Sequence, residues 1–75
     1  MESIGSIRKT DTAEVRVSRS YWKGRPVVDL RIWFVPDGGA DFVPSRKGLT
    51  IDIGKLPELV SLLSTVADAT PQIAA

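Results

Sequence analysis

The sequence contains no cysteine and no histidine. The first absence excludes disulfide bonds and thiolate metal sites, and the second removes the commonest metal ligand and acid–base catalyst. No apolar run approaches the roughly 20 residues that a transmembrane helix needs, and the first residues lack the apolar core of a signal peptide. We therefore expect no enzymatic activity, no metal, no cofactor and no membrane partner.

The chain is also short. Its 75 residues suffice for one domain, and a domain of this size buries only about 60% of the surface that its unfolded chain exposes. Small proteins without disulfides or metals gain stability from a partner subunit, and two-fold homodimers are the commonest soluble assemblies. We therefore expect a homodimer.

Positive charge is concentrated in the middle of the chain, although the formal net charge is only +1. Between Arg16 and Lys47 there are seven cationic residues and three acidic ones. Such a zone is typical of a surface that binds a polyanion. Taken alone, the charge favours an ordinary solvated surface. The position of these cations in the fold decides between a solvated surface and a binding surface.

Two segments alternate between apolar and polar residues, as a half-buried strand does. In the first, Ala13, Val15 and Val17 share one parity. The second, "PVVDLRIWFV", is rich in β-branched and aromatic residues. Its even-numbered residues point one way, whereas Arg31 and Trp33 point the other way together.

Turn signals divide the rest of the first fifty residues. Gly24 indicates a turn after the first strand, and "PDGG" at 36–39 predicts a hairpin turn. We interpret "ADFVP" as a short strand, "SRKG" as a basic turn and "LTIDI" as the fourth strand.

From Leu56 the apolar residues recur at helical spacing, in "KLPELVSLLSTVADA". Pro57 suits the first helical turn, where its missing N–H costs nothing, and the helix is expected to fade near Ala69. Leu62 widens the apolar stripe beyond what one sheet face requires, which points to contact with a second subunit. The predicted dimer-interface residues are Leu59, Leu62, Leu63 and Val66.

The predicted class is α+β, with four antiparallel strands followed by one helix (β-β-β-β-α). The predicted domain spans 12–70, between a flexible N-terminal arm at 1–11 and a frayed tail at 71–75. We expect the helix to cover one face of the sheet. The other face is then left to solvent or to a ligand.

Aromatic rings and cations would share that open face. Arg31 and Trp33 stand together on it, Arg16 extends it from the neighbouring strand, and basic residues flank it in two loops. Unpaired bases stack on aromatic rings while Lys and Arg follow the phosphates, so this pattern favours a single-stranded nucleic acid. Each residue also has an ordinary structural interpretation, such as a turn anchor at Trp22 or a surface ion pair at Arg31.

The motifs "WKGRPVVDLRIWF" and "PSRKGLTI", followed by a leucine-rich helix that opens with proline, resemble the positive-cofactor-four family of transcriptional coactivators. The resemblance covers about residues 14–66. It implies a curved four-stranded sheet, a homodimer with helices in its interface, and preference for single-stranded or unwound DNA. The ring order of Trp33 and Phe34 is swapped relative to the family's Tyr-Trp pair, and the chain looks like a minimal bacterial or phage version.

The resemblance and the strand pattern together select the nucleic-acid-binding candidates. These are Arg16, Trp22, Lys23, Arg25, Arg31, Trp33, Arg46, Lys47 and Gly48. The predicted function is sequence-tolerant binding of single-stranded DNA, in transcription regulation or in handling unwound DNA, with the transcription machinery as a further partner. We expect a cytoplasmic protein that is associated with the nucleoid in a bacterium, or a nuclear one in a eukaryote.

Two alternatives remain open from the sequence. Stacking tolerates both sugars, so single-stranded RNA is a second candidate ligand. The same Trp and Arg residues also suit a protein-interaction module, because these side chains dominate protein interfaces.

Overall fold

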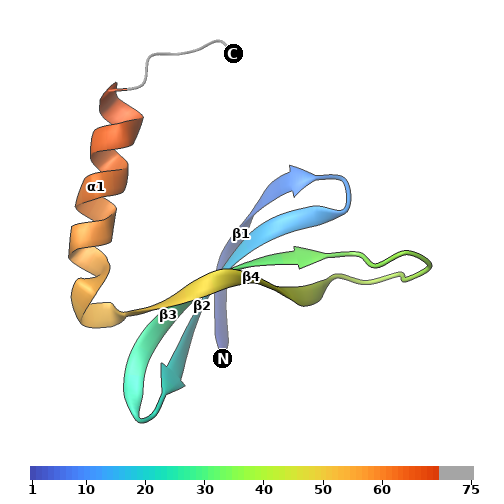
Figure 1. The fold of residues 1–75 in the computed structure, drawn as a ribbon, viewed down its shortest axis with the longest axis horizontal. Helices are drawn as coiled ribbons and strands as arrows, with labels where there is room; N and C mark the ends of the chain where they lie inside the picture. The colour runs from blue at the N-terminus through green and yellow to red at the C-terminus, as the bar shows by residue number, and fades with distance from the viewer. Residues whose placement is uncertain (70–75) are drawn as a thin grey trace.

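The computed structural model describes residues 1–69, which form one antiparallel sheet followed by a helix (Figure 1). The elements are β1 (Glu2–Thr10), β2 (Ala13–Trp22), β3 (Arg25–Phe34), β4 (Val43–Asp52), the short 3₁₀ helix η1 (Ile53–Lys55) and α1 (Leu56–Ala69). The strands lie in the sheet in chain order, and the sheet is curved. The predicted class and element order are confirmed. The tail at 71–75 lies outside the described residues, and the domain boundaries stay a prediction.

The two central strands give the sheet two different faces. β2 and β3 pair without interruption from Ala13 opposite Phe34 to Trp22 opposite Arg25, and directly opposite residues share a face. We call one side the apolar face, which carries Val15, Val17, Val28, Leu30 and Ile32. We call the other side the aromatic face, which carries Glu14, Arg16, Ser18, Trp22, Arg25, Val27, Asp29, Arg31 and Trp33. The predicted parity of β3 is confirmed.

The N-terminal segment is a strand, so the expectation of an arm at 1–11 is wrong for Glu2–Thr10. β1 pairs with β2 at the edge of the sheet, and all nine of its residues are exposed. Because neither side of this strand is buried, its sequence carries no period-two pattern. Backbone hydrogen bonds to β2 hold it in place, and burial contributes little.

The two strands expected on either side of "SRKG" are a single strand, β4, so the prediction of a basic turn at this segment is wrong. Arg31 lies opposite Gly48 and Trp33 lies opposite Pro44, which leaves a β-bulge at 45–47. A bulge bends a strand without ending it and exposes the extra residues. Because the irregularity falls in β4, the regular β3 keeps Trp33 on the aromatic face.

Gly48 permits the close approach of β4 to β3 beside this bulge. A Cβ atom at this position would lie 2.5 Å from the carbonyl oxygen of Leu30 and 2.8 Å from the Cα of Arg31. Both are backbone atoms, so a side chain here forces the two strands apart. Gly48 therefore has a structural role, whether or not a ligand approaches it.

Gly48→Ala is expected to lower the free energy of unfolding by about 1–3 kcal/mol, the usual cost of overpacking. Urea denaturation of the two proteins measures the difference. Gly5→Ala is the matched control, because a Cβ at Gly5 would meet no atom within 4 Å. Equal stability of the Gly48 variant and the wild type would contradict the close approach.

Both predicted turns are present. Lys23 and Gly24 form a two-residue connection between β2 and β3, with φ angles of 53° and 77°, as type I′ hairpins require. At the other hairpin, the N–H of Gly39 donates a hydrogen bond of 2.8 Å to the carbonyl oxygen of Pro36.

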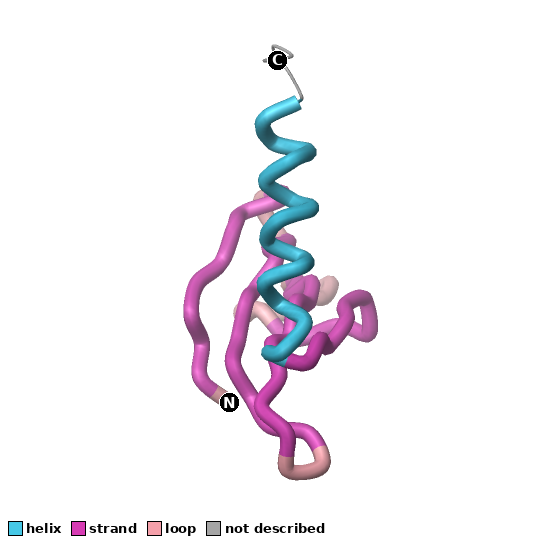
Figure 2. Tube along the Cα trace, turned by 90° about the vertical axis from the view of Figure 1, so that its left-hand side faces the viewer, coloured by secondary structure: helices cyan, strands magenta, loops and turns pink. Residues whose placement is uncertain are grey.

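The helix does not cover the apolar face, contrary to expectation. It rises from the end of β4 and stands apart from most of the sheet (Figures 1 and 2). Val60, Leu62, Leu63 and Val66 are 52–66% exposed. Among the described residues only Val27 and Val28 form a buried hydrophobic core, so most of the apolar surface of α1 remains accessible.

No helix in the described part of the chain has both the length and the apolar content to cross a membrane.

Candidate nucleic-acid interface

The turn between β2 and β3 presents an indole and a cation together. The Trp22 side chain, at the end of β2, is 60% exposed. The Nζ atom of Lys23 lies 4.6 Å from the centroid of its ring, a cation–π distance. Neither neighbouring strand covers this ring, so a flat partner has access to it.

A second aromatic cluster lies at the opposite end of the same face. The guanidinium carbon of Arg16 stands 4.1 Å from the ring centroid of Trp33 and 5.5 Å from that of Phe42. Arg8 lies 5.3 Å from the Phe42 ring. Trp33 is therefore half-buried beneath a guanidinium, whereas Trp22 is open.

Glu14 holds this second cluster in position. Its side chain is nearly buried, and its Oε2 accepts a hydrogen bond of 3.0 Å from the Nε of Arg16. Arg8 approaches its other carboxylate oxygen at 3.9 Å. The sequence alone does not identify Arg8, Glu14 and Phe42, because its pattern predicts an arm at Arg8 and a short strand at Phe42. The one sequence signal that could have identified Glu14 is that it shares the strand parity of Arg16.

Arg31 is committed to neighbouring groups on its own face. Its Nε and Nη2 donate to the two carboxylate oxygens of Asp29, at 3.2 and 2.8 Å, and its Nη1 donates to the carbonyl oxygen of Ser45 at 3.1 Å. The hydrogen bonds that Arg31 donates to Asp29 raise the pKa of Arg31 above its ordinary value. Thr50 donates to the same carboxylate at 3.3 Å. Arg31 therefore fastens the bulge to β3, and Asp29 compensates its charge.

The bulge supplies two exposed cations, Arg46 and Lys47. The N–H of Lys47 donates to the Oγ of Ser45 at 3.0 Å, which fixes the backbone there. Within residues 1–69, neither Arg46, Lys47 nor Lys23 forms an ion pair. These three cations are available to an anionic ligand.

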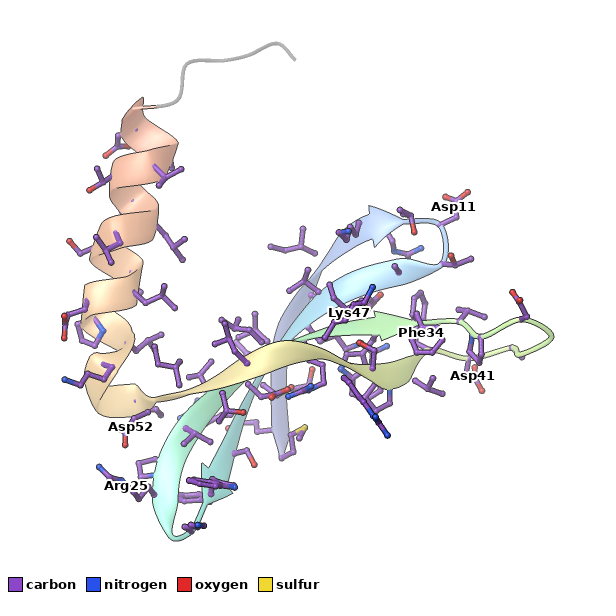
Figure 3. The ribbon with its side chains drawn as sticks, viewed as in Figure 1. Asp11, Arg25, Phe34, Asp41, Lys47 and Asp52 are labelled. Atoms are coloured by element: carbon purple, nitrogen blue, oxygen red, sulfur yellow. The ribbon has the colours of Figure 1, made fainter. Side chains whose placement is uncertain are left out.

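Figure 3 labels side chains near the two ends of the sheet and between them. Arg25 and Asp52 lie side by side near the start of the helix, with Arg25 Nε 3.1 Å from Asp52 Oδ2. Asp41 marks the far hairpin, and Lys47 lies between the two ends. Phe34 has the parity of the apolar face, so Trp33 is the ring of this pair that shares a face with Trp22.

The structure therefore brings together on one face the predicted residues Arg16, Trp22, Arg25, Arg31 and Trp33. The turn residue Lys23 and the bulge residues Arg46 and Lys47 border this face. Their roles in binding stay predictions. No group of three or more potential metal-ligating side chains occurs within the described residues.

The predicted dimer residues lie along α1 beside an apolar groove. The groove, of about 400 Å³, lies between the helix and the apolar face, and Leu59 and Leu63 line it opposite Val17 and Leu30. Leu62 is exposed beside it. This groove and the aromatic face lie on opposite sides of the sheet.

Comparison with known proteins agrees with this architecture. A family model described as Transcriptional Coactivator p15 (PC4) matches residues 9–62. A PC4 homolog from Burkholderia pseudomallei K96243 is similar in two crystal forms. The orthorhombic form has a TM-score of 0.81 and 30% identity, over 92% of both chains. The tetragonal form has a TM-score of 0.76 and 33% identity, over 88% of this chain and 96% of that one.

A bacteriophage T5 homolog of the eukaryotic coactivator PC4, implicated in recombination-dependent DNA replication, shares the fold. Its TM-score is 0.63 at 14% identity, over 91% of this chain and 78% of that one. No curated protein matches the chain. The family model covers most of the sequence, including both hairpins, the bulge and the first half of α1. The chain belongs to the family of the transcriptional coactivator p15 (PC4).

Proposed function

We propose that this protein is a non-catalytic, sequence-tolerant single-stranded DNA-binding protein that acts in transcription regulation or in handling unwound DNA. The observation that carries the proposal is that both indoles share the face opposite the apolar groove, and that the cationic turn and the cationic bulge border this face. The aromatic face then binds DNA while the groove remains free for protein contacts.

The exposed indole favours unpaired bases. Stacking of a base on an aromatic side chain contributes about 1–3 kcal/mol and tolerates every base. In a duplex the base faces are covered by neighbouring pairs, so an open ring such as Trp22 gains little from it. The ring is 60% exposed, with the Lys23 ammonium 4.6 Å from its centroid, so most of it is accessible to a base.

The spacing of the two indoles suits an extended strand. Trp22 lies opposite Arg25, and Trp33 follows Arg25 by eight residues on β3. At about 3.3 Å per residue, the two ring positions are roughly 26 Å apart. The bulge lies on the neighbouring strand between them, so its cations can contact the phosphates that connect the stacked bases.

The accessible apolar surface of α1 supports a homodimer. Four of its large apolar side chains are more than half exposed, and the groove beneath the helix is lined by aliphatic residues together with Arg19. A second copy of the chain would cover both at once, in a symmetric interface. Each dimer would then carry two aromatic faces.

The family name and the phage homolog support a role with DNA. The family is named after a transcriptional coactivator, and the phage protein is implicated in DNA replication. We propose that the transcription machinery is a further partner of this chain, and that the protein is located with the DNA it binds.

The test is a titration of labelled oligo-dT and of the matching duplex at two salt concentrations. We expect tighter binding of the single strand and weaker binding at the higher salt concentration. Duplex binding of equal strength, or affinity indifferent to salt, would contradict the proposal. Competition with oligo-U then separates DNA from RNA, since an RNA reader needs specific contacts to the 2′-hydroxyl.

The bulge cations are expected to determine part of the salt dependence. Replacing both Arg46 and Lys47 with alanine should reduce the slope of log K against log salt by about 1.4, since each phosphate contact to a single strand contributes about 0.7. The control exchanges the two residues, Arg46→Lys with Lys47→Arg, and should keep the wild-type slope. If the alanine variant keeps that slope too, the phosphates do not contact the bulge. Retained binding of a protein partner without DNA binding would favour the interaction module.

A further inference from the structure

A pocket opens on the aromatic face beside the β2–β3 turn, with a volume of about 830 Å³. Trp22 forms one wall, the buried Val27 lies in the lining, and Thr50 and Asp52 come from β4. Arg25 and Lys55 also border the pocket, and their side chains are 71% and 72% exposed. Figure 3 shows Arg25 and Asp52 together at this end of the sheet.

We propose that this pocket holds one base of the bound strand and selects a base with an exocyclic amino group over thymine. The proposal rests on the proposed function, and it adds one discriminating position to an otherwise tolerant interface. Cytosine, adenine and guanine carry such an amino group, whereas thymine presents carbonyl oxygens in its place.

The walls of the pocket suit a base. The exposed indole of Trp22 offers a stacking surface, and Val27, 5% exposed, offers an apolar contact. Sites for small ligands are concave and mostly apolar, with a few placed polar groups. Arg25 and Lys55 also line the pocket, and each already has a carboxylate partner, with Arg25 Nε 3.1 Å from Asp52 Oδ2 and Lys55 Nζ 3.9 Å from Glu58 Oε1. Their exposed charges can in addition contact the phosphates of the bound strand.

The two uncharged or anionic polar side chains of the lining, Thr50 and Asp52, present acceptors to a bound base. Asp52 Oδ1 accepts a hydrogen bond of 2.9 Å from the N–H of Gly54, and its Oδ2 forms an ion pair with Arg25. An ionised carboxylate has about four lone-pair sites, so acceptor capacity remains. The hydroxyl proton of Thr50 is committed to Asp29, so Thr50 also presents lone pairs. An amino group satisfies such acceptors, and a carbonyl oxygen is repelled by them.

Asp52→Asn tests whether the carboxylate of Asp52 selects the bound base. Asn is as good a helix-capping residue as Asp, so the hydrogen bond from Gly54 to the start of η1 can be kept. The second carboxylate oxygen becomes an NH₂ donor, which suits the O4 of thymine. The variant therefore changes the polarity of the pocket with a side chain of the same size, and it also removes the carboxylate partner of Arg25.

The experiment measures the affinities of oligo-dC and oligo-dT of equal length by fluorescence anisotropy. We expect the wild type to bind oligo-dC about fivefold more tightly, the lower end of base discrimination by a paired polar contact. Asp52→Asn should bring the dC-to-dT ratio to one or below. Glu58→Gln is the matched control: it removes the same charge and releases Lys55, which lies 3.9 Å from Glu58, and it should keep the wild-type ratio.

The outcomes separate the two proposals. Equal wild-type affinity for both oligonucleotides, or a ratio that Asp52→Asn leaves unchanged in a folded protein, overturns base selection and leaves single-stranded DNA binding in place. Binding of neither oligonucleotide overturns the proposed function itself. Circular dichroism checks the fold of each variant, and if Asp52→Asn fails to fold, the wild-type ratio decides.

Discussion

Leu63→Glu is expected to abolish dimerisation and to lower the stability of the protein. Leu63 is 57% exposed in the isolated chain and lines the groove beneath α1. In the proposed dimer this position is buried, and an unpaired buried charge costs several kcal/mol. A penalty of about 3 kcal/mol raises the dissociation constant of the dimer more than 100-fold. Sedimentation equilibrium measures this change directly.

The wild type provides a second, independent measurement. Because the buried hydrophobic core within residues 1–69 consists of Val27 and Val28, we expect folding to be coupled to association. The unfolding temperature should then rise with protein concentration. A wild type that remains monomeric, with an unfolding temperature independent of concentration, would exclude the dimer.

Ser61→Glu is the matched control for Leu63→Glu. It introduces the same charge two residues earlier, on the polar side of α1, since successive helical residues are about 100° apart. Its dissociation constant and unfolding temperature should stay near those of the wild type. If both glutamate variants dissociate equally, the loss reflects added charge, and the apolar stripe is not the interface.

Trp22→Ala is expected to weaken binding of oligo-dT by about 5- to 150-fold, which corresponds to the stacking of one base. The side chain is 60% exposed, so its removal should change the unfolding temperature little. Trp22→Phe keeps a ring at the same position and should retain most of the affinity. Fluorescence anisotropy with labelled oligo-dT measures all three proteins.

Tyr21 provides the control for this prediction. It precedes Trp22 on β2, is 73% exposed, and lies opposite Pro26, on the other side of the sheet. Tyr21→Ala removes an exposed ring of similar size without touching the aromatic face, so its affinity should equal that of the wild type. Equal losses for Tyr21→Ala and Trp22→Ala, or none for either, would contradict binding on this face.

Trp33 is a less direct test, although it belongs to the same face. The guanidinium of Arg16 already covers its ring at 4.1 Å, and Glu14 holds that guanidinium in place. Removal of Trp33 would disturb this cluster as well as any contact to DNA. The two indoles are therefore not equivalent.

Local patterns in the sequence were sufficient for several features of the fold. The alternation in β2 and β3 places Arg31 and Trp33 on one face, because successive strand residues point to opposite sides. Gly24 and the "PDGG" segment mark the two turns, and the apolar repeat beginning at Leu56 marks the helix. Each of these signals depends on residues close together in the chain.

Other features depend on partners far apart in the chain, and here tertiary structure was needed. β1 has no burial pattern, because an edge strand exposed on both sides is held mainly by backbone pairing with its neighbour. The continuity of β4 through its bulge depends on the approach of Gly48 to Leu30, and the position of Arg16 over Trp33 depends on strand register. The helix stands apart from the sheet, and its apolar stripe meets the chain's own strands only along the groove. Hydrophobic periodicity predicts that one face of a helix is buried, but it does not predict which surface that face packs against.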